Sequence, residues 1–300
     1  MGELAALANA VVWALTGVIT KGVGKNVKPH HIVSAQVWIG LIFLLIVGLI
    51  IDELHELIHI QLRSALFLVG GALSNTAGSL VFWLALSRST VSKVYPTTQS
   101  IFISISVLSG WLFLGDNPQI GVIGGAILII GGVVLLNWQP DDRTLDAIES
   151  SRTVKRKPRG DYIGIGLGIA TSFLWAGGFL STVIGLEETP PVAAATIRNL
   201  VPAILFIGVG IAFPSARITR VFKGNATRII LSAILFAVSA LTFVLALDNA
   251  PPGVVVVLIN TSPMWAVLMA AILLRERLTR FALGGAALSV TGIFVTLAFR

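Results

Sequence analysis

The chain has 300 residues, of which 55% are hydrophobic and only 12% are charged, and it contains no cysteine. Its mean hydropathy is +0.92, and its charged fraction is about half that of an average soluble domain, which excludes a soluble globular protein. The formal net charge of +7 would suit nucleic acid, but the basic residues are dispersed over loops rather than gathered on a folded domain. Nucleic acid is therefore not an expected partner.

Ten apolar stretches of helix length follow one another along the chain. They cover residues 4–20, 32–51, 64–86, 94–114, 120–136, 162–186, 191–213, 229–247, 253–274 and 281–299. Each is a continuous run long enough to cross a bilayer as a helix, whereas transmembrane strands would be short segments of alternating polarity. Helices satisfy their own backbone groups inside lipid. The sequence therefore predicts an all-α integral membrane protein with ten transmembrane helices.

The basic residues between these stretches lie almost entirely on one side. Eighteen of the 21 Lys and Arg fall in the odd-numbered loops, whereas Arg63 and Arg300 fall on the opposite face. Because cytoplasmic loops hold the excess of Lys and Arg, the odd-numbered loops are expected in the cytoplasm and both termini outside. The predicted location is the plasma or inner membrane of the cell, with basic loops contacting anionic lipid head groups.

Two halves of the chain repeat the same order of features. Residues 138–161 form the one long polar segment, a predicted basic cytoplasmic linker between a first repeat over 1–137 and a second over 162–300. The matched pairs, offset by 160 to 162 residues, are Trp13 with Trp175, Gln36 with Arg198, Ala85-Leu86 with Ala246-Leu247, Asp116 with Glu276, and Gly124-Gly125 with Gly284-Gly285. With five helices in each half, the second repeat must enter the membrane inverted, which is an architecture of secondary transporters.

The ninth stretch and its continuation carry a family resemblance. The matching residues are Asn260-Thr261-Ser262-Pro263, Leu273-Leu274-Arg275-Glu276-Arg277-Leu278-Thr279, Gly284-Gly285 and Gly292, with a weaker echo in Leu114-Gly115-Asp116, Gly124-Gly125 and Gly131-Gly132. The chain resembles the drug/metabolite transporter superfamily, in its ten-helix branch of paired EamA domains, over nearly its whole length. This resemblance implies a basket of eight helices, with the fifth and tenth as outer supports, that moves small metabolites, usually outward.

Arg198 is the most informative single residue, because it lies inside the seventh stretch. Counting from Pro191 places it roughly 10 Å along the helix. An arginine at a helix centre costs about 2.5 to 3.5 kcal/mol on insertion scales and is a functional candidate. All 14 Asp and Glu lie in loops or at the ends of stretches, so an anionic ligand is a natural partner. The structural alternative is an arginine that snorkels or binds backbone carbonyls near Pro202.

Aromatic and amide side chains inside the stretches complete the predicted cavity. The candidates are Trp13, Gln36, Asn75, Trp83, Gln99, Trp175 and Asn260, together with Arg198. Aromatic walls with a few amides suit a small amphiphilic molecule. The alternative is structural, because tryptophan also forms interfacial belts and amides also bond between packed helices. Trp13 and Trp175 rank highest, because the repeat relates them.

Residues 55–59 spell His-Glu-Leu-Ile-His, a zinc-binding pattern when it lies on a helix. A membrane zinc metallopeptidase is therefore the alternative function, with His55 and His59 as the candidate metal ligands. The pattern lies in a short connection between the second and third stretches, without a soluble domain to hold a peptide. An amphipathic turn at the membrane surface is the preferred explanation of this pattern.

The expected function is secondary transport of a small metabolite by alternating access. The resemblance and Arg198 together favour export of an amino acid or a related carboxylate or amphiphile. The expected partners are this small molecule and membrane lipids. No catalytic residue, enzyme activity, metal or cofactor is predicted, and a monomer is sufficient because ten helices already supply both halves of a pathway.

Overall fold

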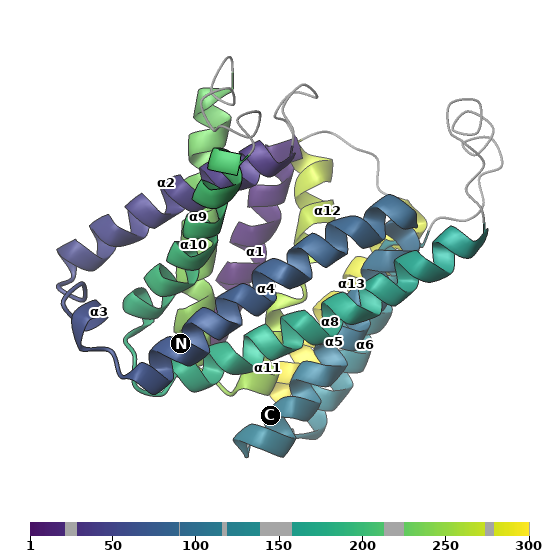
Figure 1. The fold of residues 1–300 in the computed structure, drawn as a ribbon. Helices are drawn as coiled ribbons and strands as arrows, with labels where there is room; N and C mark the ends of the chain where they lie inside the picture. The colour runs from purple at the N-terminus through teal and green to yellow at the C-terminus, as the bar shows by residue number, and fades with distance from the viewer. Residues whose placement is uncertain are drawn as a thin grey trace.

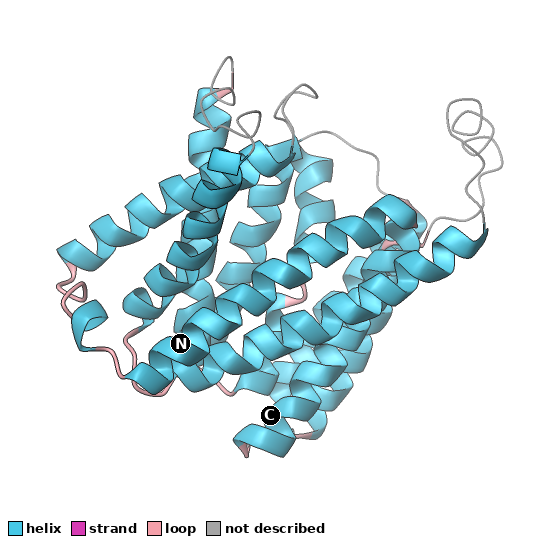
Figure 2. Ribbon diagram, viewed as in Figure 1, coloured by secondary structure: helices cyan, strands magenta, loops and turns pink. Residues whose placement is uncertain are grey.

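The computed structural model is built of helices throughout the residues that it describes, with no strand among them (Figure 2). The described residues are 1–21, 29–89, 91–115, 119–138, 158–212, 225–273 and 279–299. The helices are α1 (Gly2–Lys21), α2 (Pro29–Ile50), α3 (Glu56–His59), α4 (Leu62–Arg88), α5 (Val91–Leu114), α6 (Ile120–Leu136), α8 (Pro158–Leu186), α9 (Pro191–Ala212), α10 (Ala226–Asn249), α11 (Pro252–Ile259), α12 (Ser262–Leu273) and α13 (Arg280–Ala298). Most of the predicted linker lies outside the described residues.

These helices confirm the predicted series of ten spans. Eight segments of the described chain are long and apolar enough to cross a membrane, and two shorter apolar segments, Ile120–Leu136 and Pro191–Ile207, complete the series. The short α3 lies outside it, in the connection between the second and third spans. Large apolar side chains remain exposed on the outside of the bundle, including Ile50, Phe113 and Phe294. Contact of such a surface with lipid chains carries no free-energy penalty, whereas its contact with water is unfavourable.

The ninth span differs from the single helix predicted over 253–274. It is divided into α11 and α12, with Asn260 and Thr261 between them. The physical reason is Pro263, which has no N–H to bond the carbonyl of Ile259 and whose ring would clash with that carbonyl. The chain instead makes tight turns, in which the N–H of Thr261 bonds the carbonyl of Leu258 at 3.1 Å. Two helix ends therefore meet inside this span.

The pair formed by α6 and α13 runs antiparallel and is in very close contact. A side chain at Gly125 would come within 2.8 Å of the Gly292 carbonyl oxygen, and one at Gly132 within 2.7 Å of the Gly285 carbonyl oxygen. Glycine allows helix backbones to approach this closely. Adding the predicted offset of 160 residues to Gly125 and Gly132 gives Gly285 and Gly292. The repeat therefore relates the contact of Gly125 with Gly292 to the contact of Gly285 with Gly132. Equivalent helices that run in opposite directions are what inverted repeats require.

Six of the other helices form two symmetry-related groups, each built from both halves of the chain, as in the neighbouring α4 and α8 (Figure 1). We call α1, α2 and α10 the first flank, and α8, α9 and α4 the second flank. Adding a side chain at Gly2 would bring it against Ala250 of the first flank, and adding one at Gly164 would bring it against Ser89 of the second. Gly164 follows Gly2 by 162 residues, and Ala250 follows Ser89 by 161. The two flanks therefore share one packing geometry.

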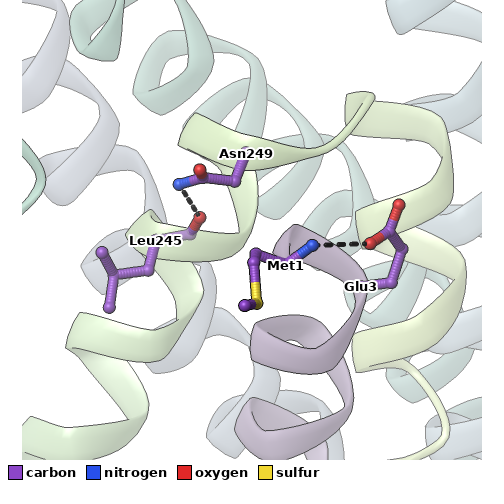
Figure 3. Close-up of polar contacts among 4 residues, drawn as sticks. All are labelled: Met1, Glu3, Leu245 and Asn249. Carbon is purple, nitrogen blue, oxygen red and sulfur yellow. Dashed lines mark hydrogen bonds and ion pairs between the residues drawn. The ribbon is translucent and has the colours of Figure 1, made fainter.

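Both chain termini lie at the end of the bundle that holds the even-numbered connections. The start of α1 lies beside the end of α10, where Met1 pairs with Glu3 and Asn249 donates to the Leu245 carbonyl at 3.0 Å (Figure 3). At the other terminus, the N–H of Gly121 donates to the Phe299 carbonyl at 3.1 Å. An even number of spans places the termini in this way, in agreement with ten.

Candidate functional site

Arg198 lies on α9 with its guanidinium against an aromatic ring and without any polar partner. Its Cζ lies 4.6 Å from the centroid of the Phe243 ring on α10. Its Nε is buried and unbonded, and the side chain makes no hydrogen bond or ion pair in the described parts of the chain. The ring face is negative, so it attracts the cation but offers no hydrogen-bond acceptor of carboxylate strength. The site therefore holds an unpaired positive charge.

The local sequence of α9 explains why the helix holds Arg198 at this depth. Pro191 begins the helix, where its missing N–H costs nothing. The Glu53 carboxylate accepts from the N–H of Val192 at 3.1 Å and so caps the helix start from the other half of the chain. Pro202 lies inside the helix and has no N–H for the Arg198 carbonyl four residues earlier. Arg198 is therefore one turn before a weakened point of α9.

A line of aromatic rings, which we call the aromatic row, leads away from Arg198 and joins α10 to α8 and α5. Its members are Phe243 on α10, Phe179 and Trp175 on α8, and Phe102 on α5. The Phe243 and Phe179 centroids are 6.2 Å apart, Phe179 and Phe102 are 6.3 Å apart, and Phe102 and Trp175 are 6.2 Å apart. All three pairs meet edge to face, the arrangement that the ring quadrupoles favour.

Two predicted candidates, Trp175 and Gln99, lie at the far end of the aromatic row. The Trp175 ring also contacts Phe82 at 5.2 Å, and Phe82 contacts Tyr95 at 6.1 Å. Gln99 lies on α5 between Tyr95 and Phe102, four residues after the first and three before the second, which places all three on one helix face. The Trp175 Nε1 and the Gln99 Oε1 are both buried without a hydrogen-bond partner.

Gln36, the repeat equivalent of Arg198, is fully engaged in the first flank. Its Nε2 donates to the Thr20 hydroxyl at 3.2 Å and to the Ser232 hydroxyl at 3.4 Å. The residue is buried and ties α2 to α1 and α10. Trp13 in the same flank contacts Phe236 at 6.0 Å and is 49% exposed. The structure therefore joins Gln36 to a structural hydrogen-bond network rather than to the aromatic row.

The remaining candidates, Asn260, Trp83 and Asn75, make no ring contact or side-chain hydrogen bond with the aromatic row among the described residues. Asn260 is buried at the break between α11 and α12, where its Nδ2 donates to the Val256 carbonyl at 2.7 Å. Trp83 is 54% exposed, and neither it nor the exposed amide of Asn75 makes a ring contact or side-chain hydrogen bond within the described residues. These three remain predicted cavity residues without a shared contact.

Sequence reasoning missed the phenylalanines of the row. Phe102, Phe179 and Phe243 are three of 15 phenylalanines in a largely apolar chain, so none stands out by residue type. One usable signal existed, because Phe243 follows Phe82 by 161 residues, which is the offset of the repeat. Both of these repeat-related rings meet predicted site residues, since Phe82 contacts Trp175 and Phe243 lies under Arg198.

The zinc-binding pattern is not assembled as a metal site in the described residues. His55 precedes α3, and its Nε2 lies 3.1 Å from the Glu56 carboxylate. His59 ends the same single turn, and both imidazoles lie in an exposed connection. The described residues contain no group of three or more His, Cys, Asp or Glu able to hold a metal ion. The structure gives the metallopeptidase alternative no support.

Comparisons with known proteins agree with this architecture. A solved crystal structure described only as "Crystal structure of protein" superposes with a TM-score of 0.81 and 16% identity, covering 100% of this chain and 97% of that one, which shows the fold. "Uncharacterized transporter" of Archaeoglobus fulgidus is 24% identical over 98% of this chain and 94% of its own length. "Uncharacterized transporter YvbV" of Bacillus subtilis is 31% identical, over 49% of this chain and only 48% of its own length.

The family model for the EamA-like transporter family matches residues 1–138 and again residues 162–298. The two matches leave out only the polar segment between them and the last residues. They confirm the resemblance drawn from the glycine pairs and from the Asn260-Thr261-Ser262-Pro263 stretch. A chain matched over almost all of its length by this model, with ten apolar helical segments in one bundle, is a multi-pass membrane protein that belongs to the EamA-like transporter family.

Proposed function

We propose that this transporter exports an amino acid or a related small carboxylate by alternating access, with Arg198 receiving the anionic group. The observation that carries the proposal is the half-buried Arg198 side chain, whose Nε is buried and unbonded and whose guanidinium lies on the Phe243 ring. A buried charge normally has a partner, because an unpaired one is strongly unfavourable. The partner in this case is the substrate.

The chemistry of arginine favours a carboxylate as that partner. The guanidinium presents a planar fork of donors that matches a carboxylate with two parallel hydrogen bonds. Within the described helices, no Asp or Glu lies away from a helix end to neutralise Arg198. The aromatic row beside it supplies an apolar surface for the remainder of a small amphiphile.

Alternating access requires elements that have two arrangements, and two features of the bundle meet this requirement. Pro202 weakens α9 just beyond Arg198, and the break at Asn260 and Thr261 divides the ninth span. Inverted repeats carry out alternating access by moving one group of helices against the other around a fixed site. In this scheme, Arg198 contacts the Phe243 ring when no substrate is bound. The substrate carboxylate then replaces the ring as its partner.

The test measures transport and binding by purified protein in reconstituted vesicles. The probes are labelled amino acids and monocarboxylates, each compared with its uncharged primary amide. Arg198→Lys keeps the charge without the fork and is expected to retain part of the flux, whereas Arg198→Ala retains very little. The apparent affinity of Arg198→Ala for a carboxylate should fall about 30-fold or more. Arg280→Ala is the matched control, because Arg280 also lies over a ring, that of Phe281, but at a helix end.

Three results would contradict the proposal. One is an Arg198→Ala protein that stays folded and transports a carboxylate with unchanged apparent affinity. The other is an Arg198→Ala protein that loses thermal stability together with flux, because that loss indicates an arginine needed for structure. Carboxylates that bind no better than their amides would also overturn the assignment of Arg198 to an anionic group.

The same proposal includes an orientation in the cell membrane. Residues 138–161, between repeats over 1–137 and 162–300, would be cytoplasmic, with the other odd-numbered loops. Because the chain has no natural cysteine, Ser150→Cys and Glu187→Cys can be labelled one at a time with an impermeant thiol reagent on intact cells. Labelling of Glu187→Cys alone is expected, and labelling of Ser150→Cys alone would reverse the orientation.

One copy of the chain is sufficient in this proposal, with membrane lipids as its surroundings. The aromatic row combines α5 of the first half with α8 and α10 of the second, so a single chain supplies the whole row. Vesicles containing unsubstituted and Arg198→Ala protein in varied proportions should show flux in proportion to the unsubstituted fraction. A curve that falls faster than the fraction would indicate that two copies act together.

A further inference from the structure

Trp175 and Gln99 present two unmet hydrogen-bonding atoms of opposite kind. The indole Nε1 of Trp175 can only donate, and the Oε1 of Gln99 can only accept. Both atoms are buried and neither has a partner. Buried polar atoms in folded proteins are almost always bonded, so these two unmet atoms call for an explanation.

Aromatic residues connect the two side chains. Phe102 lies one turn after Gln99 on α5, and its ring meets the Trp175 ring at 6.2 Å. On the other side, Phe82 contacts Trp175 at 5.2 Å and Tyr95 at 6.1 Å, and Tyr95 lies one turn before Gln99. The donor and the acceptor therefore belong to one location, at the end of the aromatic row away from Arg198.

The position of the indole is fixed by close packing with α4. A side chain at Gly78 would come within 2.6 Å of the Trp175 Cδ1 and 2.9 Å of its Nε1. Only glycine therefore leaves room for the edge of the ring that bears the N–H. Ser74, one turn earlier on α4, bonds the carbonyl of Leu174 at 2.7 Å and holds the neighbouring backbone. The unmet N–H is thus a consequence of ordered packing rather than of a loose side chain.

We propose that Trp175 and Gln99 form a second recognition point, which binds a hydroxyl or amide group at the far end of the substrate. One hydroxyl can accept from the Trp175 N–H and donate to the Gln99 Oε1 at the same time. The ligand class is then a carboxylate with an apolar body and a neutral polar group at its other end. The body lies along the aromatic row, and the carboxylate lies at Arg198. This inference rests on the proposed function and adds the polar end to it.

The test uses two probes that differ by one hydroxyl, 3-(4-hydroxyphenyl)propionate and 3-phenylpropionate. Dissociation constants are measured by thermal stabilisation of the purified full-length protein. The unsubstituted protein is expected to bind the hydroxylated probe about tenfold more tightly, because one buried pair of hydrogen bonds is gained. Trp175→Phe keeps a ring but removes the N–H, and should reduce this preference to less than twofold while binding 3-phenylpropionate nearly as before.

Two further variants complete the test. Gln99→Leu removes the acceptor and should reduce the preference in the same way as Trp175→Phe. Trp111→Phe is the matched control, because Trp111 lies exposed near the end of α5 and should leave the preference near tenfold. A Gln99→Leu protein that is too unstable to purify is replaced by Gln99→Glu, which keeps an acceptor but adds a charge and should weaken the binding of both probes.

The possible outcomes separate this inference from the proposed function. Equal binding of both probes by the unsubstituted protein, with binding still lost in Arg198→Ala, would overturn the second recognition point and leave Arg198 in place. A preference that survives Trp175→Phe would indicate that the hydroxyl binds elsewhere. Absence of binding by both probes to the unsubstituted protein would overturn the second recognition point, and the vesicle test with amino acids and monocarboxylates would then decide the proposed function separately.

Discussion

The two flanks of the bundle share their backbone packing but differ in how their polar side chains are bonded. In the first flank, the Gln36 amide donates to Thr20 and Ser232, and Asn9 donates to the Ser239 carbonyl at 2.6 Å. In the second flank, the equivalent of Gln36 is Arg198, which has no hydrogen-bond partner and rests on an aromatic ring. The same backbone geometry therefore holds a hydrogen-bonded network, which we call the closed network, in the first flank and an unbonded arginine in the second.

This difference separates scaffold from site more sharply than residue type does. A buried amide that meets its partners stabilises the packing of helices, whereas a buried charge without a partner lowers stability and is retained for another reason. The residue equivalent to Phe179, at the 162-residue offset, is Gly17, so the ring that links Phe243 to Phe102 has no counterpart on α1. An inverted repeat can thus duplicate a fold while its matched positions differ in whether the polar side chain is bonded.

The largest expected effect concerns the close contact between α6 and α13, which are the equivalent last helices of the two repeats. In Gly125→Val, the new side chain meets the Gly292 carbonyl and its surroundings, so the pair must separate along its length. Overpacking of this kind costs about 3 kcal/mol or more, enough to remove most of the folded protein. Gly131→Val on the same helix is the control, because its added atom meets nothing within 4 Å. Size-exclusion yield in detergent measures both, and equal yields would contradict the close packing.

The next largest effect concerns the closed network of the first flank, in which Asn9 of α1 bonds Ser239 of α10. In Asn9→Leu, the Ser239 carbonyl and hydroxyl lose their donor, and the link between α1 and α10 is removed. We expect a loss of about 1–2 kcal/mol of stability, seen as a lower melting temperature in detergent. Asn249→Leu serves as the control, because that amide is exposed at the end of α10. A melting temperature of Asn9→Leu equal to that of the control would show that the network does not hold the flank.

Methionine substitution of the matched pair sharpens the comparison through the sign of the change. Gln36→Met removes bonds to Thr20 and Ser232 and should lower stability by about 0.5–1 kcal/mol. Arg198→Met removes an unpaired, half-buried charge and should raise stability by about 1 kcal/mol after loss of the contact with Phe243, while transport falls. Melting temperatures and vesicle flux measured on both proteins decide the matter. A decrease in both melting temperatures would mean that Arg198 is also a scaffold residue.

The smallest expected effect concerns the contact that joins the start of α9 to the other half of the chain. Glu53→Gln keeps the shape but removes the negative charge that faces the N–H of Val192 at the helix start. We expect a loss of about 0.3–1 kcal/mol, reduced by added salt. Asp52→Asn, on a neighbouring but exposed carboxylate, is the control. A salt-independent difference between the two variants would rule out an electrostatic cap.

The sequence alone was enough for the ten helices, the inverted repeat and the location of Arg198 inside a span, because each produces a signal along the chain. Long apolar runs predict spans, and a charge inside one of them stands out. It could not distinguish Gln36 from Gln99, since both are amides in apolar helices. Their difference lies in partners far away in sequence, such as Ser232, 196 residues from Gln36. The break after Ile259 was missed as well, although Pro263 was visible, because a continuous apolar run outweighed one proline.

The position of Arg198 has a consequence for the response of the transporter to voltage. It is the one charged side chain away from a helix end in the described helices. A single elementary charge that crosses the whole potential changes the free energy by about 2.3 kcal/mol per 100 mV. If the proposed function holds, Arg198 gives the empty transporter one net positive charge within the electric field of the membrane. A bound monoanion then cancels this charge. Membrane voltage would then act on the return of the empty carrier and leave the loaded step almost unaffected.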